Sequence, residues 1–409
     1  MAEIYPFQAV RPAEKLAGKI AALPYDVYSS EEARREVERN PYSFLKVDRA
    51  ETQFPAGTSP YEDAVYQKAA QTLQEMQQDG ELIREDAPSL YLYELTMEGR
   101  SQTGFVGCAS VREYEQGKIR RHENTRAEKE EDRVRHVDAC NAHTGPIFLS
   151  YPASEDLRRI AEEVRGQKPL YDVTFEDGVR HRIFRISDEA RIGAVRGAFA
   201  KIPRVYIADG HHRAASAVRV AQKRRQTNPN SEAERFLAVF FPDDELKIYD
   251  YNRILKDLGG YDAAGFLRRL QEDFTVEQAK TAPYAPKRKG EFGLYLDGRW
   301  YCMSLREPEQ TDDPVESLDV SVLQRRVLER ILGICDPKTD PRIDFVGGIR
   351  GLGELERRVD SGKAKAAVSM YPTSMEELFR TADANLCMPP KSTWFEPKLR
   401  SGFFIHELG

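Results

Sequence analysis

The feature that most constrains the fold of this chain is a short apolar run that ends abruptly in polar residues. Residues 204–217 read RVYIADGHHRAASA, a pattern that predicts a buried strand, a tight turn and then a helix. The first turn of a helix has free backbone N–H groups and a positive dipole end, which attract anions. Arg213, His211 and His212 add donors, and Gly210 allows close approach to the backbone. A phosphate suits this turn; the alternative is a helix cap with solvated polar residues.

Length and composition limit the classes of protein to consider. A chain of 409 residues predicts two or three domains, and 31% charged residues suit a soluble globular protein. The net charge of −6, with scattered Lys and Arg, argues against a nucleic-acid partner. No apolar run approaches the ~18–20 residues of a membrane span, and the N-terminus does not resemble a signal peptide. Five widely spaced cysteines without a CxxC pair indicate reduced thiols, so we expect a cytoplasmic location.

Local patterns predict several elements before the central turn. Ser29 and Glu32 are spaced as a capping box for a helix at about 30–39. Residues 42–47 read YSFLKV and predict a strand. Residues 173–184 predict a hairpin that turns at an Asp-Gly pair. We expect three regions, at 1–85, 86–255 and 256–409.

A second polar cluster lies about ninety residues before the central turn. Arg121, His122, Glu123 and Asn124 follow a short apolar run, at the place where a strand should end. The cluster combines a carboxylate with three hydrogen-bonding partners, which is typical of a site as well as of a solvated loop. The charged run at 126–137 favours an exposed helix face.

The C-terminal tail is rich in proline and has neither a helical nor an alternating pattern. It contains Lys391, Ser392, Thr393 and Lys398, together with one of the two tryptophans. We weigh two interpretations: an extended arm that packs on the protein, and a segment that closes over an anionic ligand.

Several segments spread over nearly the whole chain resemble the DUF1015 family. They are Pro6-Phe7 with Arg11-Pro12, Leu23-Pro24-Tyr25-Asp26-Val27, Arg121-His122-Glu123 with Thr125, Lys129-Glu130-Glu131-Asp132-Arg133, Ala208-Asp209-Gly210-His211-His212-Arg213, and Met388-Pro389-Pro390-Lys391-Ser392-Thr393. The resemblance implies an α+β fold, with a ParB/sulfiredoxin-like central α/β domain and additional N-terminal and C-terminal α+β regions. The central turn also resembles the nucleotide-phosphate loop of free-serine kinases, which phosphorylate L-serine with ATP or ADP.

The resemblance also implies roles for individual residues. The phosphates would be held by Gly210, His211, His212 and Arg213. Asp209 would bind Mg²⁺ or the substrate hydroxyl, and Glu123, beside His122, would be the general base. Arg121, Thr125, Lys391, Ser392 and Thr393 are candidate substrate-binding residues. A carboxylate in line with the nucleophile, and positioned cations on the phosphate oxygens, are what phosphoryl transfer needs.

Three functions stay open at this point. The first is a Mg²⁺-dependent phosphotransferase that uses ATP or ADP and acts on a small hydroxy metabolite, foremost L-serine. The second is a metal-assisted hydrolase of a phosphoester or nucleotide at the same site. The third is a ParB-like nucleotide-binding regulatory protein, which would need a basic recognition helix. The phosphate donor, the acceptor and the oligomeric state are undetermined, with a homodimer as one candidate.

Overall fold

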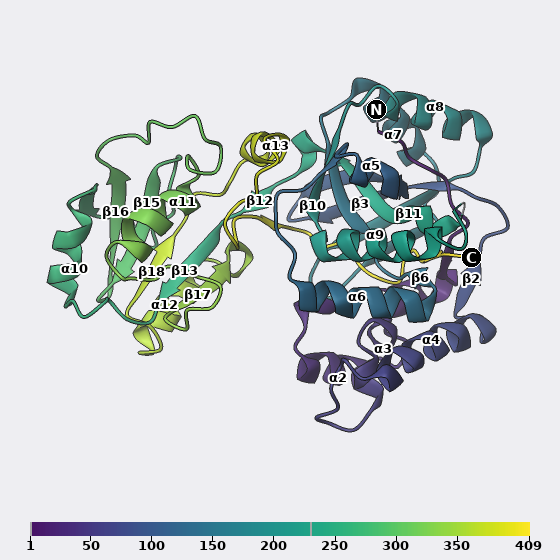
Figure 1. The fold of residues 1–409 in the computed structure, drawn as a ribbon, viewed down its shortest axis with the longest axis horizontal. Coiled ribbons are helices and arrows are strands. Elements are labelled where there is room, and N and C mark those ends of the chain that lie inside the picture. Colours follow the sequence, from purple (N-terminus) through teal and green to yellow (C-terminus); the bar gives the residue numbers. More distant parts are fainter. Residues whose placement is uncertain (1, 230) are drawn as a thin grey trace. The chain divides into compact units, whose positions relative to one another are not determined.

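The computed structural model of the chain describes residues 2–229 and 231–409. Contacts within the chain divide it into two units. Unit 1 contains the residues up to Leu246 together with Pro397–Gly409, and unit 2 contains Lys247–Glu396. The segment 1–85 contributes to unit 1, and the last residues of the chain return to it. In Figure 1 this returning tail is the thin yellow trace that passes α6 and β6.

Unit 1 is built on an eight-stranded mixed sheet, whose strands are arranged in the order β5-β10-β7-β11-β4-β3-β9-β8. Their bounds in this order are Ile119–Arg120, Val205–Asp209, Ile147–Tyr151, Arg235–Pro242, Arg100–Ser110, Leu90–Met97, Arg180–Ile186 and Tyr171–Thr174. β10 runs parallel to β5 and antiparallel to β7. The central strands read as continuous apolar runs because they are buried on both faces.

Helices cover the sheet and build the core with it. Their bounds are Val111–Glu115 for α5, Ala127–Cys140 for α6, Glu155–Arg165 for α7, Glu189–Phe199 for α8 and His211–Arg225 for α9. α9 buries a run of small residues at 214–217, which lets it pack closely. Figure 1 shows α5, α9, α6 and α4 one below another, and consecutive members of this series are in contact. The main apolar cluster lies between these helices and the strands.

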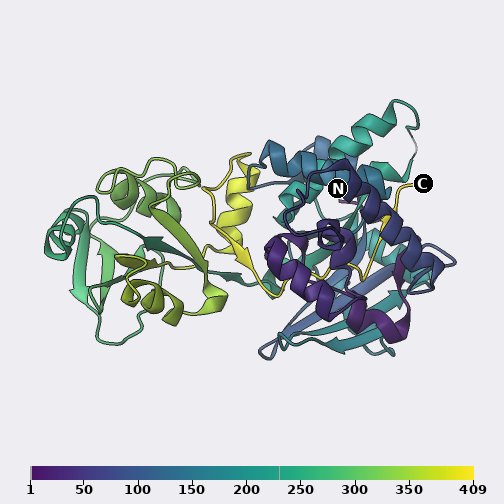
Figure 2. The same cartoon turned by 90° about the horizontal axis from the view of Figure 1, so that it is seen from below.

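The N-terminal segment forms a helical layer on α6 with its own apolar cluster. Its elements are β1 (Val10–Pro12), α1 (Ala17–Ile20), α2 (Ser30–Arg39), α3 (Leu45–Asp48), α4 (Asp63–Gln78) and β2 (Leu82–Arg84). The capping box of Ser29 and Glu32 is present at the start of α2, as predicted. Figure 2 shows these purple helices from another side. The returning tail joins unit 1 through β20 (His406–Glu407), which pairs with β6 (Ala142–His143).

Unit 2 is built on a six-stranded antiparallel sheet with the order β14-β16-β15-β18-β13-β17. In this order the strands are Phe274–Gln278, Arg299–Leu305, Glu291–Leu296, Ala366–Ser369, Tyr251–Leu255 and Ile343–Gly347. Its α-helices are α10 (Ala263–Leu270), α11 (Asp319–Leu323), α12 (Gly353–Asp360) and α13 (Met375–Asp383), and a π-helix at Gln324–Glu329 follows α11. A short antiparallel pair joins β12 (Ile248–Tyr249) to β19 (Trp394–Phe395).

The fold class is α+β, as the sequence predicts. The predicted hairpin at 173–184 is confirmed as β8 and β9. The predicted strand at 42–47 is wrong, because this segment turns into the short helix α3. Phe44, Leu45 and Val47 are fully buried, and an apolar run buried on all sides has no period that distinguishes strand from helix. None of the helices in the described part of the chain has the length and apolar character that a bilayer span requires.

Candidate functional site

The site is organised by two neighbouring parallel strands that end at the same edge of the sheet. β5 and β10 pair in parallel, with Ile119 opposite Val205 and Arg120 opposite Tyr206. The segments that follow them, 121–125 and 209–213, therefore leave the sheet side by side. In open α/β sheets, ligands bind at this carboxyl edge of the strands. The two polar clusters that are ninety residues apart in sequence are thus brought together.

The predicted strand, turn and helix are confirmed at 205–225. Asp209 ends β10, Gly210 adopts φ +92°, and His211 begins α9. This left-handed conformation favours glycine. A Cβ at position 210 would also lie 3.1 Å from Nε of Arg213, so glycine keeps space next to the guanidinium. The turn has the shape that an anion-binding helix start requires.

Asp209 is an ionised carboxylate held between the turn and the C-terminal tail. Its Oδ1 accepts a hydrogen bond from the backbone N–H of Gly210 at 2.9 Å, and its Oδ2 lies 3.2 Å from Nζ of Lys398. Burial raises the pKa of Asp209, but the charges of Lys398 and Arg213 outweigh it and lower the pKa to about 2. Its side chain remains 33% exposed, so a ligand can reach it.

Arg213 forms no ion pair within the described residues, although its charge acts on the nearby carboxylate of Asp209. Its guanidinium donates one hydrogen bond to the carbonyl oxygen of Pro146 at 2.5 Å. The ion pairs formed by the described part of the chain do not include it. A partly buried guanidinium that lacks an anion is suited to bind one, because its fork of donors matches phosphate and carboxylate oxygens.

The two histidines of the turn connect the two halves of the site. Nε2 of His211 accepts a hydrogen bond from the backbone N–H of His122 at 3.5 Å, and Nε2 of His212 accepts one from Arg126 at 3.1 Å. Since each Nε2 accepts, each neutral ring carries its proton on Nδ1. The rings of His122 and His211 meet edge to face with centroids 4.5 Å apart. The histidines therefore hold the segment 122–126 against the start of α9.

Burial keeps these imidazoles neutral. It lowers the pKa of His122 to about 4 and that of His211 well below its ordinary value. The pKa of His212 is lowered too, first by burial and then by Arg126. At neutral pH they act as hydrogen-bonding groups, so the positive charge next to the turn comes from Arg213 and Lys398.

Glu123 lies beside His211. Its Oε2 is 3.8 Å from Nδ1 of His211, and its side chain is 46% exposed. The negative charge of Asp209 acts on His211 as well, but burial outweighs it and lowers the pKa of that imidazole. Both acidic residues thus act on the same imidazole, and both side chains are partly exposed.

The other candidate residues have different surroundings. Arg121 is exposed, and its charge helps to lower the pKa of His211. Thr125 donates to Glu130 on α6 at 2.9 Å. In unit 2, Lys391 lies 5.3 Å above the ring of Tyr251. The hydroxyl of Ser392 donates to Pro389, and Thr393 directly precedes β19.

Lys398 lies at the candidate site through a contact that the sequence did not predict. Its only signal was a lysine in a tail of prolines and small polar residues. The contact with Asp209 spans 189 positions and depends on the return of the tail to unit 1. No local pattern reports such a pairing.

The donor set for a metal is small. Within the described residues, no group of three or more His, Cys, Asp or Glu side chains is arranged to hold a metal ion. Mg²⁺ in phosphate-binding sites is usually held by one or two carboxylates plus phosphate oxygens. Asp209 can supply one carboxylate, so the residues fit Mg²⁺ only as a partner of a bound phosphate chain. The five cysteines, all in the described part of the chain, form no disulfide bond.

Comparison with known proteins identifies the family. A family model described as "Protein of unknown function (DUF1015)" matches residues 4–321. The chain belongs to the DUF1015 family. The match covers both halves of the site and ends within unit 2, so Lys398 of this DUF1015 protein lies beyond it. No curated protein matches the chain.

Three solved structures resemble this DUF1015 protein, each over 74% of its length. One is a free serine kinase in complex with AMP, with a TM-score of 0.38, 15% identity and 91% of that chain covered. The second is SbnI with a C-terminal truncation from Staphylococcus aureus, with a TM-score of 0.38, 11% identity and 87% of that chain covered. The third is a conserved hypothetical protein from Pyrococcus furiosus, with a TM-score of 0.35, 15% identity and 95% of that chain covered.

Proposed function

We propose that this protein is a nucleotide-dependent phosphotransferase that acts on a small hydroxy metabolite, with L-serine as the first acceptor to test. The observation that carries the proposal is that two carboxylates and two cationic side chains lie near the start of one helix. The cations are Arg213, which forms no ion pair within the described residues, and Lys398, which pairs with Asp209. Arg213, Lys398 and the backbone N–H groups of α9 supply the positive field for phosphate oxygens. The resemblance of the turn to the phosphate loop of free-serine kinases supports the same assignment.

The residues divide the work as phosphoryl transfer requires. Arg213 and Lys398 hold the phosphate oxygens, and Gly210 lets them approach the backbone. Glu123 accepts the proton of the acceptor hydroxyl, while His211 orients that carboxylate through its Nδ1. Asp209 stays ionised across the physiological pH range, which suits a ligand of Mg²⁺ or of the hydroxyl. A bound Mg²⁺ would neutralise phosphate charge during transfer.

A hydrolase at the same site is the second candidate. The observation that favours it is the 46% exposure of Glu123, because a base open to solvent can activate water in place of an alcohol. The regulatory alternative has less support. The basic run at the end of α9 pairs with acidic groups, Lys223 and Arg224 with Asp138 and Arg225 with Glu115. These cations are already neutralised, whereas a nucleic-acid surface needs them for phosphates.

The test is a product assay on the full chain with Mg²⁺, ATP or ADP, and L-serine, in which O-phosphoserine and free phosphate are measured by phosphorus NMR. We expect O-phosphoserine. The variant Glu123→Gln should lower the rate about 10²–10⁴-fold, the usual contribution of a general base. Asp209→Asn should lose transfer as well, and both variants should keep the wild-type melting profile.

The matched control is Glu128→Gln, which changes an exposed carboxylate in the first turn of α6 and should leave the rate unchanged. Free phosphate without O-phosphoserine would favour the hydrolase. If neither product forms and calorimetry detects no nucleotide binding, the proposal is refuted. Wild-type turnover in either acidic variant would remove that residue from the mechanism.

A further inference from the structure

A small cavity with several polar side chains in a largely apolar wall lies in unit 1 next to the turn at 209–213. Its volume is about 30 Å³, and Arg213 belongs both to its wall and to the turn. Such a volume holds about two water-sized groups. Its wall also includes Tyr25, Asp48, Arg133 and Ser401, so the N-terminal layer, α6 and the returning tail all contribute to it.

Opposite charges face this cavity without being paired to each other. Asp48 is buried and accepts a hydrogen bond from the hydroxyl of Thr144 at 2.7 Å. The described residues place no cation within ion-pair distance of it, although the charges of Asp48 and Arg133 act on each other over a longer distance. The guanidinium of Arg133 is buried too, and its Nε and Nη2 are engaged by Asp132. Its Nη1 makes no hydrogen bond within the described residues. A buried carboxylate without a cation is costly unless a ligand supplies one.

One polar atom of a residue in the cavity wall lacks a protein partner among the described residues. Nε2 of His143 is buried and has no hydrogen-bond partner among the described residues, while its Nδ1 faces His406. Gly145 keeps the space open, because a Cβ there would lie 2.8 Å from Oγ of Ser401 and 3.4 Å from Nη1 of Arg213. Buried polar groups are rarely left unsatisfied, so this imidazole nitrogen indicates a polar occupant.

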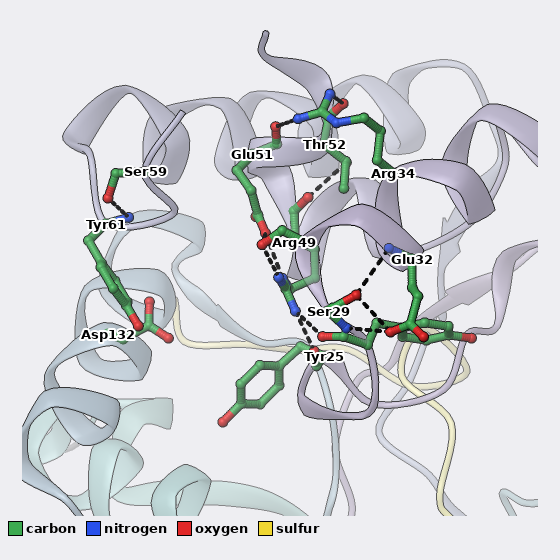
Figure 3. A network of polar contacts seen from close by, with 12 residues as sticks. Tyr25, Ser29, Glu32, Arg34, Arg49, Glu51, Thr52, Ser59, Tyr61 and Asp132 are labelled. Carbon is green, nitrogen blue, oxygen red and sulfur yellow. Dashed lines mark hydrogen bonds and ion pairs between the residues drawn. The ribbon is translucent and has the colours of Figure 1, made fainter. Parts of the chain in front are cut away.

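The aromatic wall is fixed by a network in the N-terminal layer. Arg49 donates to the carbonyl oxygens of Tyr25 at 2.9 Å and Tyr28 at 2.7 Å, and pairs with Glu51 at 2.7 Å (Figure 3). Arg133 lies 4.1 Å from the centre of the Tyr25 ring. The ring and the guanidinium are therefore held in place before any ligand arrives, which lowers the entropic cost of binding.

We infer that this cavity is the head-group subsite for a small zwitterionic amino acid, and that it selects the acceptor of the proposed transfer. The ammonium group would bind to Asp48 and the carboxylate to Arg133. The hydroxyl would stay outside, on the Arg213 side, where the turn holds the phosphates. The role of the cavity in selecting the acceptor rests on the proposed function, whereas the binding of the amino acid does not.

Calorimetry on the full chain tests the inference with three probes: L-serine, ethanolamine, which lacks the carboxylate, and 3-hydroxypropionate, which lacks the ammonium. We expect each one-headed probe to bind at least tenfold more weakly than L-serine. The variant Asp48→Asn should weaken L-serine binding at least tenfold and leave ADP binding unchanged. The variant Gly145→Ala should weaken L-serine binding to the same extent. Arg133→Gln should act like Asp48→Asn, and its control is Arg135→Gln, an arginine on the same helix that pairs with Asp63 outside the cavity.

The outcomes separate this inference from the proposed function. Equal binding of the three probes, unchanged affinity in the variants, or no L-serine binding by the wild type would overturn the subsite, and the cavity would then hold water alone. Nucleotide binding and phosphate transfer would be judged independently by the product assay. L-serine binding with head-group selectivity but without transfer would refute the phosphotransferase and keep the subsite. Since Gly145→Ala adds only a methyl group, it keeps the test informative if the charge variants fail to fold.

Discussion

Lys398 and His122 show how single residues acquire their properties from distant partners. The carboxylate of Asp209 would be harder to ionise in its half-buried position without the ammonium of Lys398 and the guanidinium of Arg213. His122 experiences the opposite situation, because burial dominates and keeps its ring neutral. Both effects follow from the surroundings and not from the residue type.

The neutral state of His122 predicts a loss of stability in acid. An unfolded imidazole takes up a proton below about pH 6.5, whereas the folded His122 resists it down to about pH 4. The free energy of unfolding therefore falls as the pH drops through this window. For His122 alone the loss at pH 5 relative to pH 7.5 is about 2 kcal/mol. Urea unfolding at both pH values measures this loss. Between pH 7.5 and pH 5, the free energy of unfolding of the variant His122→Gln should fall by about 2 kcal/mol less than that of the wild type. An equal fall in both proteins would contradict the prediction.

At the scale of elements, the turn between β10 and α9 combines backbone strain with ligand geometry. Gly210 and Gly178 both have positive φ angles, +92° and +76°. A Cβ at 178 would meet nothing within 4 Å, but one at 210 would meet the guanidinium of Arg213. A residue with a Cβ would therefore be strained at either position, but only at position 210 would it also disturb the candidate site.

Substitution of these glycines separates the two contributions. Gly210→Ala and Gly178→Ala should each lower the free energy of unfolding by about 1–2 kcal/mol, the cost of the left-handed conformation for a residue with a Cβ. Only Gly210→Ala should weaken ADP binding, by tenfold or more, because it displaces Arg213. Denaturant unfolding and calorimetry measure the two effects. Equal ADP affinity in both variants would argue against a phosphate contact at Arg213.

At the scale of the whole molecule, the chain completes unit 1 only with its last residues. Phe403, Phe404 and Ile405 are fully buried, and the ring of Phe404 packs against Tyr91 at a centroid distance of 5.0 Å. The tail also places Lys398 beside Asp209. Residues 247–396 form unit 2 between these two parts of the unit 1 sequence.

This arrangement predicts that a tail mutation acts on unit 1. Phe404→Ala should destabilise unit 1 by about 3–5 kcal/mol, the usual cost of removing a buried ring. Phe266→Ala is the matched control, since Phe266 is equally buried but belongs to α10 of unit 2. Calorimetric melting should show each variant lowering a different transition. A shift of the same transition by both would contradict the division into two units.

Much of the local structure could be predicted because it depends on neighbours in sequence. The capping box at Ser29, the hairpin at 173–184 and the change from strand to helix at Gly210 each depend on a few adjacent residues, and each is present. The strand predicted at 42–47 was wrong because Phe44 and its neighbours are buried by other segments, which no local period reports.

The sequence by itself determined the phosphate-suited turn at 209–213, because conformational freedom, charge and helix polarity are local properties. Only the tertiary structure decided which groups share that turn. The parallel pairing of β5 with β10 brings Glu123 to His211, and the return of the tail brings Lys398 to Asp209. Such contacts depend on the free energy of packing the whole of unit 1, in which each segment is placed by the burial of the others.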